Sequence, residues 1–226
     1  MELPPKEPAL LEPPRIVLKY DRPVVWRPTA RVPFAFRPFC ETKEDALLEA
    51  GVIRKSESEF HAPALCVQQH SKIRFCVDYR GLNGNTRTIF STLPHIEDLF
   101  LRLKGAVFLT TFDMTDGYYH IDLEPSSRHK TAFSTYRGFY EWVRVPFGLK
   151  NAPVHFNNEV RKVFKDLVFV NTYFDDICIF LRTAEEHLAH LEEVLFLIPI
   201  TLGLFSQNQP VYLGLNCLRN YNLTSA

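Results

Sequence analysis

The sequence has little that would indicate a secreted or membrane protein. Its five cysteines are an odd number and include no C-x-x-C pair, so we expect reduced thiols in an intracellular protein, cytoplasmic or nuclear. The longest apolar stretch, around residues 194–205, is too short to span a bilayer and contains Pro199. The N-terminus is acidic and rich in proline, whereas a signal peptide begins basic and then turns apolar. No membrane association is predicted.

The chain also lacks net charge, because 26 basic residues balance 26 acidic ones. This balance neither indicates nor excludes a nucleic-acid partner, since binding depends on local basic patches. There is no internal repeat. A length of 226 residues with 46% hydrophobic content predicts a globular protein of one domain or two closely packed subdomains.

Proline is concentrated at one end of the chain. Nine of the sixteen prolines precede residue 40, which predicts an extended tether over residues 1–41. Thr42 resembles the N-cap of a short helix that Gly51 would end. We therefore expect the folded domain to span residues 42–198, followed by a less defined segment over residues 199–226.

Hydrophobic periodicity predicts an alternation of strands and helices. Strand pairs are expected at 64–67 with 73–77 and at 130–133 with 140–145, and a further strand at 107–112. Helices are expected at 94–103, at 151–167 and at 184–197, the last with Leu188, Leu191, Val194 and Leu195 on one face. His187 and His190 on that helix could suggest a metal site, but a solvated face is the favoured interpretation.

Two adjacent carboxylates are the most informative feature. Asp175 and Asp176 lie between the apolar runs 167–170 and 177–180, which predicts a hairpin with the carboxylates at its tip. A third carboxylate, Asp113, ends the strand at 107–112. If the strands are neighbours, the three could hold two Mg²⁺ ions for polymerase chemistry. The alternative for Asp175 and Asp176 alone is a solvated acidic turn.

An ordered set of motifs resembles the reverse transcriptase of gypsy-type long-terminal-repeat retrotransposons. The match covers roughly residues 42–198. Its segments are GVIRKSES at 51–58, AP at 62–63, RFCVDYRGLN at 74–83, FD at 112–113, GY at 117–118, KTAF at 130–133, VPFGL at 145–149, NAP at 151–153, YFDD at 173–176 and EHL at 186–188. The resemblance implies an α+β fold with right-hand polymerase fingers and palm, and an antiparallel palm sheet backed by helices.

The resemblance also implies the metal site. Asp113, Asp175 and Asp176 fall on the family's catalytic triad, and the backbone carbonyl of Met114 is a further metal contact. The implied cofactor is Mg²⁺, with Mn²⁺ as an alternative. The implied partners are an RNA or DNA template with its primer, and deoxynucleoside triphosphates.

Nucleotide contacts are implied for other residues. Arg74 falls on the family's triphosphate-binding arginine, and Lys72 is expected to assist it. Tyr118 matches an aromatic gate that excludes a 2′-hydroxyl, and Phe147 and Gly148 fall where the family lines the nucleotide pocket. Asp78 and Arg80 are expected to form an ion pair in the fingers.

Some segments depart from the family's pattern. The turn at 67–72 has lost most of a lysine-rich stretch, which predicts weaker phosphate binding. Asn171 and Thr172 replace a normally apolar pair. We find no complete thumb, ribonuclease H or integrase segment, and expect these from other parts of a polyprotein. The alternatives are a catalytically weak or inactive remnant that binds nucleic acid or protein, and an RNA-dependent RNA polymerase, which Tyr118 disfavours.

Overall fold

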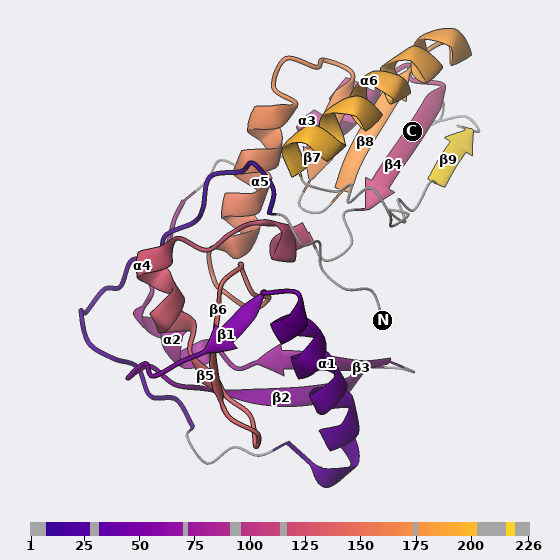
Figure 1. Cartoon of the computed structure of the whole chain (residues 1–226). Helices are drawn as coiled ribbons and strands as arrows, with labels where there is room; N and C mark the ends of the chain where they lie inside the picture. Colours follow the sequence, from indigo (N-terminus) through magenta and orange to yellow (C-terminus); the bar gives the residue numbers. More distant parts are fainter. Residues whose placement is uncertain are drawn as a thin grey trace. The chain divides into compact units, whose positions relative to one another are not determined.

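The structure is a computed structural model that describes residues 8–27, 32–69, 72–90, 96–113, 117–173, 176–202 and 216–219. The chain divides into two compact units, each built from two stretches of sequence. The first unit comprises residues 1–89 and 118–152, and the second comprises residues 90–117 and 153–226. Each unit combines a sheet with helices (Figure 1).

The first unit contains a five-stranded sheet in the order β1-β6-β5-β2-β3. Its strands are β1 (Ile53–Lys55), β2 (Ala62–Gln69), β3 (Lys72–Val77), β5 (Phe133–Ser134) and β6 (Phe139–Trp142). All neighbours are antiparallel except β2 and β5, which are parallel. Both expected strand pairs are present, but the second begins later because residues 129–131 form the 3-10 turn η3 (His129–Thr131).

Aromatic packing builds the core of this unit. The ring of Trp142 stacks on that of Tyr119 at 5.4 Å between centroids and lies 5.6 Å from that of Phe133. Phe133 and Trp142 are both buried. The helices of the unit are α1 (Arg37–Glu49), α2 (Arg80–Asn85) and α4 (Pro125–Arg128), with 3-10 turns η1 (Phe34–Phe36) and η2 (Gly117–His120).

The N-terminal segment is extended, as expected, but it is not a tether. Residues 8–27 pack along the first unit, and Ile16 is buried with its N–H donating to Ser127 Oγ at 2.9 Å. The Trp26 indole Nε1–H donates to Asp78 Oδ2 at 3.0 Å. Prolines prevent a helix here without preventing packing, because an extended chain can pair its backbone groups with a neighbouring surface.

The first helix begins earlier than predicted. It starts at Arg37, with Pro38 in its first turn, rather than after Thr42. Proline is tolerated there because the first N–H groups of a helix have no intrahelical partner. The end is as predicted: Gly51, at φ +67°, follows the last turn in the left-handed conformation.

The prediction that all cysteines are reduced is wrong for one pair. Cys40 of α1 and Cys66 of β2 are joined as a disulfide, with their Cα atoms 7.3 Å apart. Both lie in an apolar cluster with Val32, and Phe36 and Phe39 pack against it. They are separated by 26 residues in sequence, and no local spacing pattern indicated their pairing. Cys76 and Cys178 are free thiols.

The second unit contains an antiparallel sheet in the order β7-β8-β4-β9. Its strands are β4 (Phe108–Asp113), β7 (Val170–Tyr173), β8 (Asp176–Leu181) and β9 (Asn216–Arg219). The hairpin and β4 were predicted, but the first strand of the hairpin was expected at 167–170, whereas β7 begins at Val170 and Val168 is 79% exposed. Strand β9 was not, because residues 199–226 show no clear strand pattern, yet it pairs with β4 along Phe108–Thr111.

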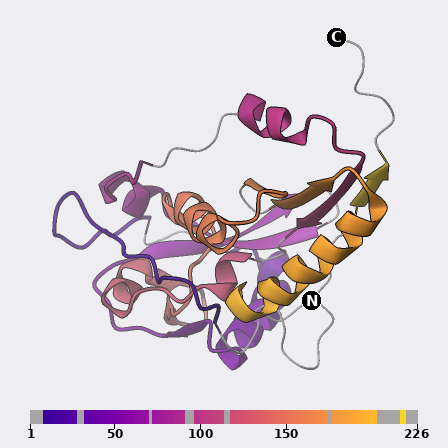
Figure 2. The same ribbon diagram turned by 90° about the horizontal axis from the view of Figure 1, so that it is seen from above.

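Helices cover both faces of this sheet. They are α3 (Ile96–Leu103), α5 (Ala152–Val163) and α6 (Ala184–Leu202). Figures 1 and 2 show α3 and α6 on opposite sides of the strands. The two faces follow from the alternation of side chains along a strand. Ile177 and Ile179 of β8 are fully buried, whereas Asn171 of β7 donates toward Leu99 O of α3 at 3.5 Å.

The buried face of α6 differs from the predicted one. Leu188 is 64% exposed, whereas Val194 is buried as predicted, together with His187 and Ile198. His187 Nε2 is hydrogen-bonded to Thr110 Oγ1 of β4 at 2.7 Å. The interpretation of His187 as part of a solvated face is therefore wrong. Its imidazole is buried and pairs with a buried hydroxyl.

This buried histidine predicts a pH-dependent stability. Burial, with a smaller contribution from His190, holds the pKa of His187 below its usual value, so folding favours the neutral ring. The unfolded chain then binds more protons between the two pKa values, and stability falls as pH drops below about 6.5. Urea unfolding at pH 7.5 and 5.5 should show a lower midpoint at pH 5.5. A His187→Gln variant should lose part of that difference, whereas His155→Gln should keep it.

Asn171 and Thr172 are buried, as their place before the hairpin implies. Oδ1 of Asn171 has no hydrogen-bond partner. An unpaired buried acceptor costs about 1 to 3 kcal/mol, so we expect Asn171 to lower the stability of this unit. Within the described residues, we find no helix with the length and apolar character needed to cross a membrane.

Candidate active site

Asp113 and Asp176 lie at the ends of two neighbouring strands of the second unit. β4 and β8 are antiparallel neighbours, and their register places Asp113 directly opposite Asp176. On the other side of β8, Asp176 pairs with Tyr173 of β7. The sequence-based condition that the two strands be sheet neighbours is therefore confirmed. Asp175 lies at the connection of β7 to β8, outside the described residues.

Apolar pairs just inside the strand ends hold this register. Phe112 faces Ile177 one step before the carboxylates, and both side chains are fully buried. A slip of one residue by either strand would turn its buried side chain to the other face of the sheet, so burial fixes the pairing strongly. Asp176 itself is exposed. Burial, and then the negative charge of Asp176, raises the pKa of Cys178 to about 11, so that thiol stays protonated at neutral pH.

The donor set fits a hard divalent cation. Carboxylate oxygens are the ligands that Mg²⁺ and Mn²⁺ prefer, and the register brings at least two carboxyl-bearing residues to one strand end. Among the side chains that the structure describes, no group of three His, Cys, Asp or Glu forms a metal cluster. The side chain of Asp113, and the whole of Met114 and Asp175, lie outside that description.

Arg74 and Lys72 belong to β3 in the first unit. Arg74 is exposed and pairs in register with Val67 of β2, and Lys72 begins the strand opposite Gln69. The Lys72 side chain lies outside the described part. An exposed guanidinium on a hairpin strand is available to a phosphate, because it can donate two parallel hydrogen bonds.

Tyr118, Phe147 and Gly148 come together in the first unit. The Tyr118 ring is 8% exposed and meets that of Phe147 edge to face, with centroids 4.9 Å apart. Phe147 also meets Tyr119 edge to face at 5.1 Å and is 41% exposed. Gly148 has φ +92°, a left-handed conformation that other residues adopt only with strain. The sequence predicted these three residues as parts of one pocket; the structure brings the rings of Tyr118 and Phe147 into contact, and Gly148 follows Phe147 in the chain.

The ion pair of Asp78 and Arg80 is confirmed. Arg80 Nη2 lies 2.6 Å from Asp78 Oδ2, and Arg80 Nε donates to Asp78 Oδ1 at 2.8 Å. These hydrogen bonds, together with that from Trp26, hold the pKa of Asp78 well below its usual value. Asp78 thus links the N-terminal segment to α2, a contact that no sequence motif indicated.

Asn83 is a residue whose role the sequence did not reveal. Its side chain donates to Gly148 O and accepts from Lys150 N–H. Asn83 is the last residue of the motif at 74–83, and its place in that motif was the only indication of a role in the sequence. Only its contacts show that it holds the segment around Gly148.

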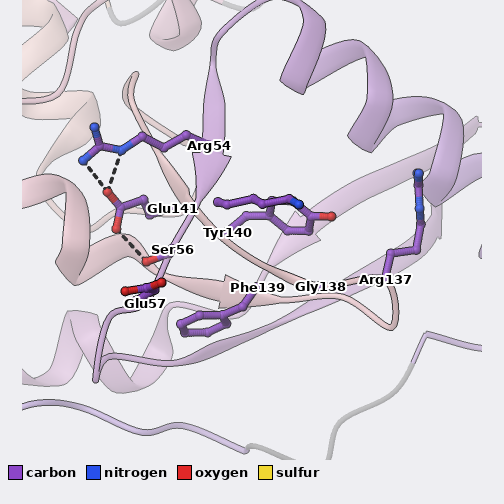
Figure 3. Close-up of a pocket in the computed structure, with 9 residues that line it drawn as sticks. Arg54, Ser56, Glu57, Arg137, Gly138, Phe139, Tyr140 and Glu141 are labelled. Atoms are coloured by element: carbon purple, nitrogen blue, oxygen red, sulfur yellow. Dashed lines mark hydrogen bonds and ion pairs between the residues drawn. The ribbon is translucent and has the colours of Figure 1, made fainter.

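A cavity of about 610 Å³ opens along β1 and β6 of the first unit, and its lining includes none of these residues (Figure 3). Arg54 and Glu141 on its wall form an ion pair at 2.6 Å, and Ser56 Oγ donates to Glu141 at 2.6 Å. At another part of the wall, Arg137 pairs with Asp45 at 2.7 Å. Because both arginines are neutralised, the cavity offers little net positive charge to a phosphate.

Similarity to known proteins supports the resemblance to reverse transcriptases that the sequence motifs indicated. Residues 53–198 match the family model described as "Reverse transcriptase (RNA-dependent DNA polymerase)". The chain is 29% identical over 187 residues to the "Putative enzymatic polyprotein" of Cassava vein mosaic virus, covering 78% of this chain and 29% of that protein. It is 34% identical over 171 residues to the "Retrovirus-related Pol polyprotein from transposon opus" of Drosophila melanogaster, covering 72% of this chain and 17% of that protein.

A solved structure agrees in fold. The foamy viral protease-reverse transcriptase in complex with RNA/DNA hybrid superposes with a TM-score of 0.76 at 25% identity, covering 87% of this chain and 27% of that one. The predicted α+β fold with fingers and palm is therefore confirmed. The chain spans less than a third of each of these relatives. With a family model matched over more than half of its length, the chain belongs to the reverse transcriptase (RNA-dependent DNA polymerase) family.

Proposed function

We propose that this chain is the fingers-and-palm part of a reverse transcriptase from a gypsy-type long-terminal-repeat retrotransposon. It adds deoxynucleotides to a primer 3′-hydroxyl on an RNA or DNA template. The observation that carries the proposal is the register of β4 and β8, which pairs Asp113 with Asp176 across two strands distant in sequence. The similarity to the transposon opus polyprotein favours a retrotransposon origin.

The proposed chemistry is phosphoryl transfer at the strand ends of the palm. Asp113, Asp175 and Asp176, with the carbonyl of Met114, would hold two Mg²⁺ or Mn²⁺ ions. Bound there, these ions would activate the primer hydroxyl and stabilise the pyrophosphate leaving group. The remaining work of the protein is positioning and electrostatic stabilisation, which dominate catalysis of this reaction class.

In the fingers, Arg74 and Lys72 bind the triphosphate. Tyr118 lies under the sugar and excludes a 2′-hydroxyl, and Phe147 and Gly148 line the pocket beside it. The template–primer is the macromolecular partner, as the RNA/DNA hybrid is for the foamy viral relative. We further propose an intracellular site of action, cytoplasmic or nuclear, within a polyprotein whose other segments supply thumb, ribonuclease H and integrase.

Primer extension tests the proposal directly. The purified chain, given a primer on an RNA or a DNA template with deoxynucleotides and Mg²⁺ or Mn²⁺, should extend the primer. Chelation of the metal should stop extension. If the wild type is as inert as an Asp113→Ala variant yet still binds RNA, the chain is instead a non-catalytic remnant.

Replacement of Arg74 by Ala should weaken deoxynucleotide binding. Loss of charge-assisted hydrogen bonds to phosphate should raise KM for the deoxynucleotide by about 10- to 100-fold, with a smaller change in kcat. Steady-state kinetics of single-nucleotide addition measure this. Arg74→Lys keeps the charge but lacks the planar guanidinium, so its KM should lie between those of the wild type and Arg74→Ala. The KM of Lys165→Ala should match that of the wild type. Equal KM in Arg74→Ala and wild type would contradict the assignment.

A further inference from the structure

The loop that carries Phe147 and Gly148 is held by a side-chain clamp. Asn83 Nδ2–H donates to Gly148 O at 2.8 Å, and Asn83 Oδ1 accepts from Lys150 N–H at 2.9 Å. One carboxamide thus pairs with two backbone groups on either side of Leu149. A donor and an acceptor fixed in one plane constrain both the position and the rotation of the peptide they hold.

The base of the clamp is anchored in the unit. Asn83 lies within α2, and its own N–H donates to Tyr79 O at 2.7 Å. Tyr79 is 2% exposed, and its hydroxyl donates to Thr131 O at 2.8 Å. Leu82, beside Asn83, is 4% exposed. A displacement of Asn83 would require movement of this buried core, so the clamp transmits a fixed position to the loop.

A second carboxamide fixes the far end of the loop. Asn151 Nδ2–H donates to Arg87 O at 2.8 Å, and its Oδ1 accepts from Ile89 N–H at 3.2 Å. The chain turns at Gly148, whose φ of +92° admits few other residues. The part of the loop that follows Phe147 is therefore held by two carboxamides.

This loop determines where the Phe147 ring lies. Phe147 meets Tyr118 at 4.9 Å and Tyr119 at 5.1 Å, each edge to face. Such aromatic pairs depend on ring orientation. Loosening the loop would therefore free the Phe147 ring from Tyr118, and with it a wall of the pocket beneath the sugar.

We propose that Asn83 is a positioning residue for nucleotide selection, acting through the loop at Pro146–Lys150 on Phe147 and Tyr118. This inference rests on the proposed function, in which Tyr118 excludes a 2′-hydroxyl. Asn83 itself need not contact the nucleotide. The Asn83 carboxamide holds the rings of Phe147 and Tyr118 in the position where they exclude a 2′-hydroxyl.

The test compares two asparagines of α2. Asn85 makes a similar pair of bonds, donating to Tyr20 O at 2.9 Å and accepting from Tyr20 N–H at 3.1 Å, but it holds the N-terminal segment instead of the loop. Asn83→Ala should raise ribonucleotide incorporation relative to deoxynucleotide by about 10-fold. Asn83→Asp, which keeps the acceptor and loses the donor, should also raise it. Asn85→Ala should leave the ratio unchanged.

Hydrogen exchange provides a readout that needs no activity. The Lys150 amide should exchange faster in the full-length Asn83→Ala chain than in the wild type, and remain protected in Asn85→Ala. Unchanged exchange in Asn83→Ala would overturn the clamp. Faster exchange with unchanged sugar selectivity would overturn its role in selection. If the wild type extends no primer under any condition, the proposed function and the role in selection both fail, and the exchange result alone decides whether the clamp exists.

Discussion

Replacement of Asp175 by Asn should abolish primer extension with either Mg²⁺ or Mn²⁺. The change keeps the side-chain volume and removes one negative charge from the proposed metal site. Loss of a group that stabilises transition-state charge costs about 10²- to 10³-fold in kcat, and loss of a metal ligand adds to that. Asp113→Asn and Asp176→Asn should be impaired in the same assay, since the register of β4 and β8 places these two residues opposite each other.

A matched control separates this effect from a loss of charge elsewhere. Asp166 is an exposed carboxylate just beyond α5 in the same unit, and Asp166→Asn should extend primers at the wild-type rate. All variants should unfold at similar urea concentrations, because Asn and Asp have nearly the same volume and apolar surface. Retained activity in Asp175→Asn would remove the triad assignment.

Replacement of Tyr118 by Val should admit ribonucleotides. The ring is held edge to face against Phe147, and without it no bulky group remains at the proposed position of the 2′-hydroxyl. We expect the ratio of ribonucleotide to deoxynucleotide incorporation, measured as kcat/KM, to rise about 10- to 100-fold. Tyr118→Phe keeps the ring and should keep the wild-type ratio.

The comparison with Asn83 makes this result more informative. If Tyr118→Val changes sugar selection and Asn83→Ala does not, the gate acts without support from the loop. If neither variant changes selection while deoxynucleotides are still incorporated, Tyr118 is a packing residue. Its low exposure and its contact with Phe147 would then serve only the core of the first unit.

The sequence allowed prediction of elements whose partners are near in the chain. The β2–β3 pair and the β7–β8 hairpin are local, and their alternation of apolar residues with turns is readable without a fold. The hydrophobic run that ends at Asp113 was also visible. The sequence analysis could only assume that β4 lies beside β8, as the metal site requires. The observed register confirms that the two strands are neighbours. The catalytic roles of the three aspartates remain predictions.

Predictions failed where a distant partner decides the outcome. The apolar pattern of α6 favoured a face containing Leu188, but Leu188 is exposed, and His187 is buried and hydrogen-bonded to Thr110, 77 residues away. Likewise, proline content predicted an extended N-terminal segment correctly and its packing incorrectly. A local pattern reports the conformation of a segment, whereas burial depends on surfaces brought from elsewhere in the chain.

The sequence by itself determined the family, the two strand ends that carry the aspartates, and the residues to test for nucleotide binding. Tertiary structure decided that β9 pairs with β4, that Cys40 meets Cys66, and that Asn83 holds the loop of Gly148. The physical reason is the separation in sequence. The chemistry of a motif requires particular residue types at particular spacings, so motifs can be recognised from the sequence alone. Contacts between segments far apart depend on how the whole chain buries its apolar surface, which no short pattern contains.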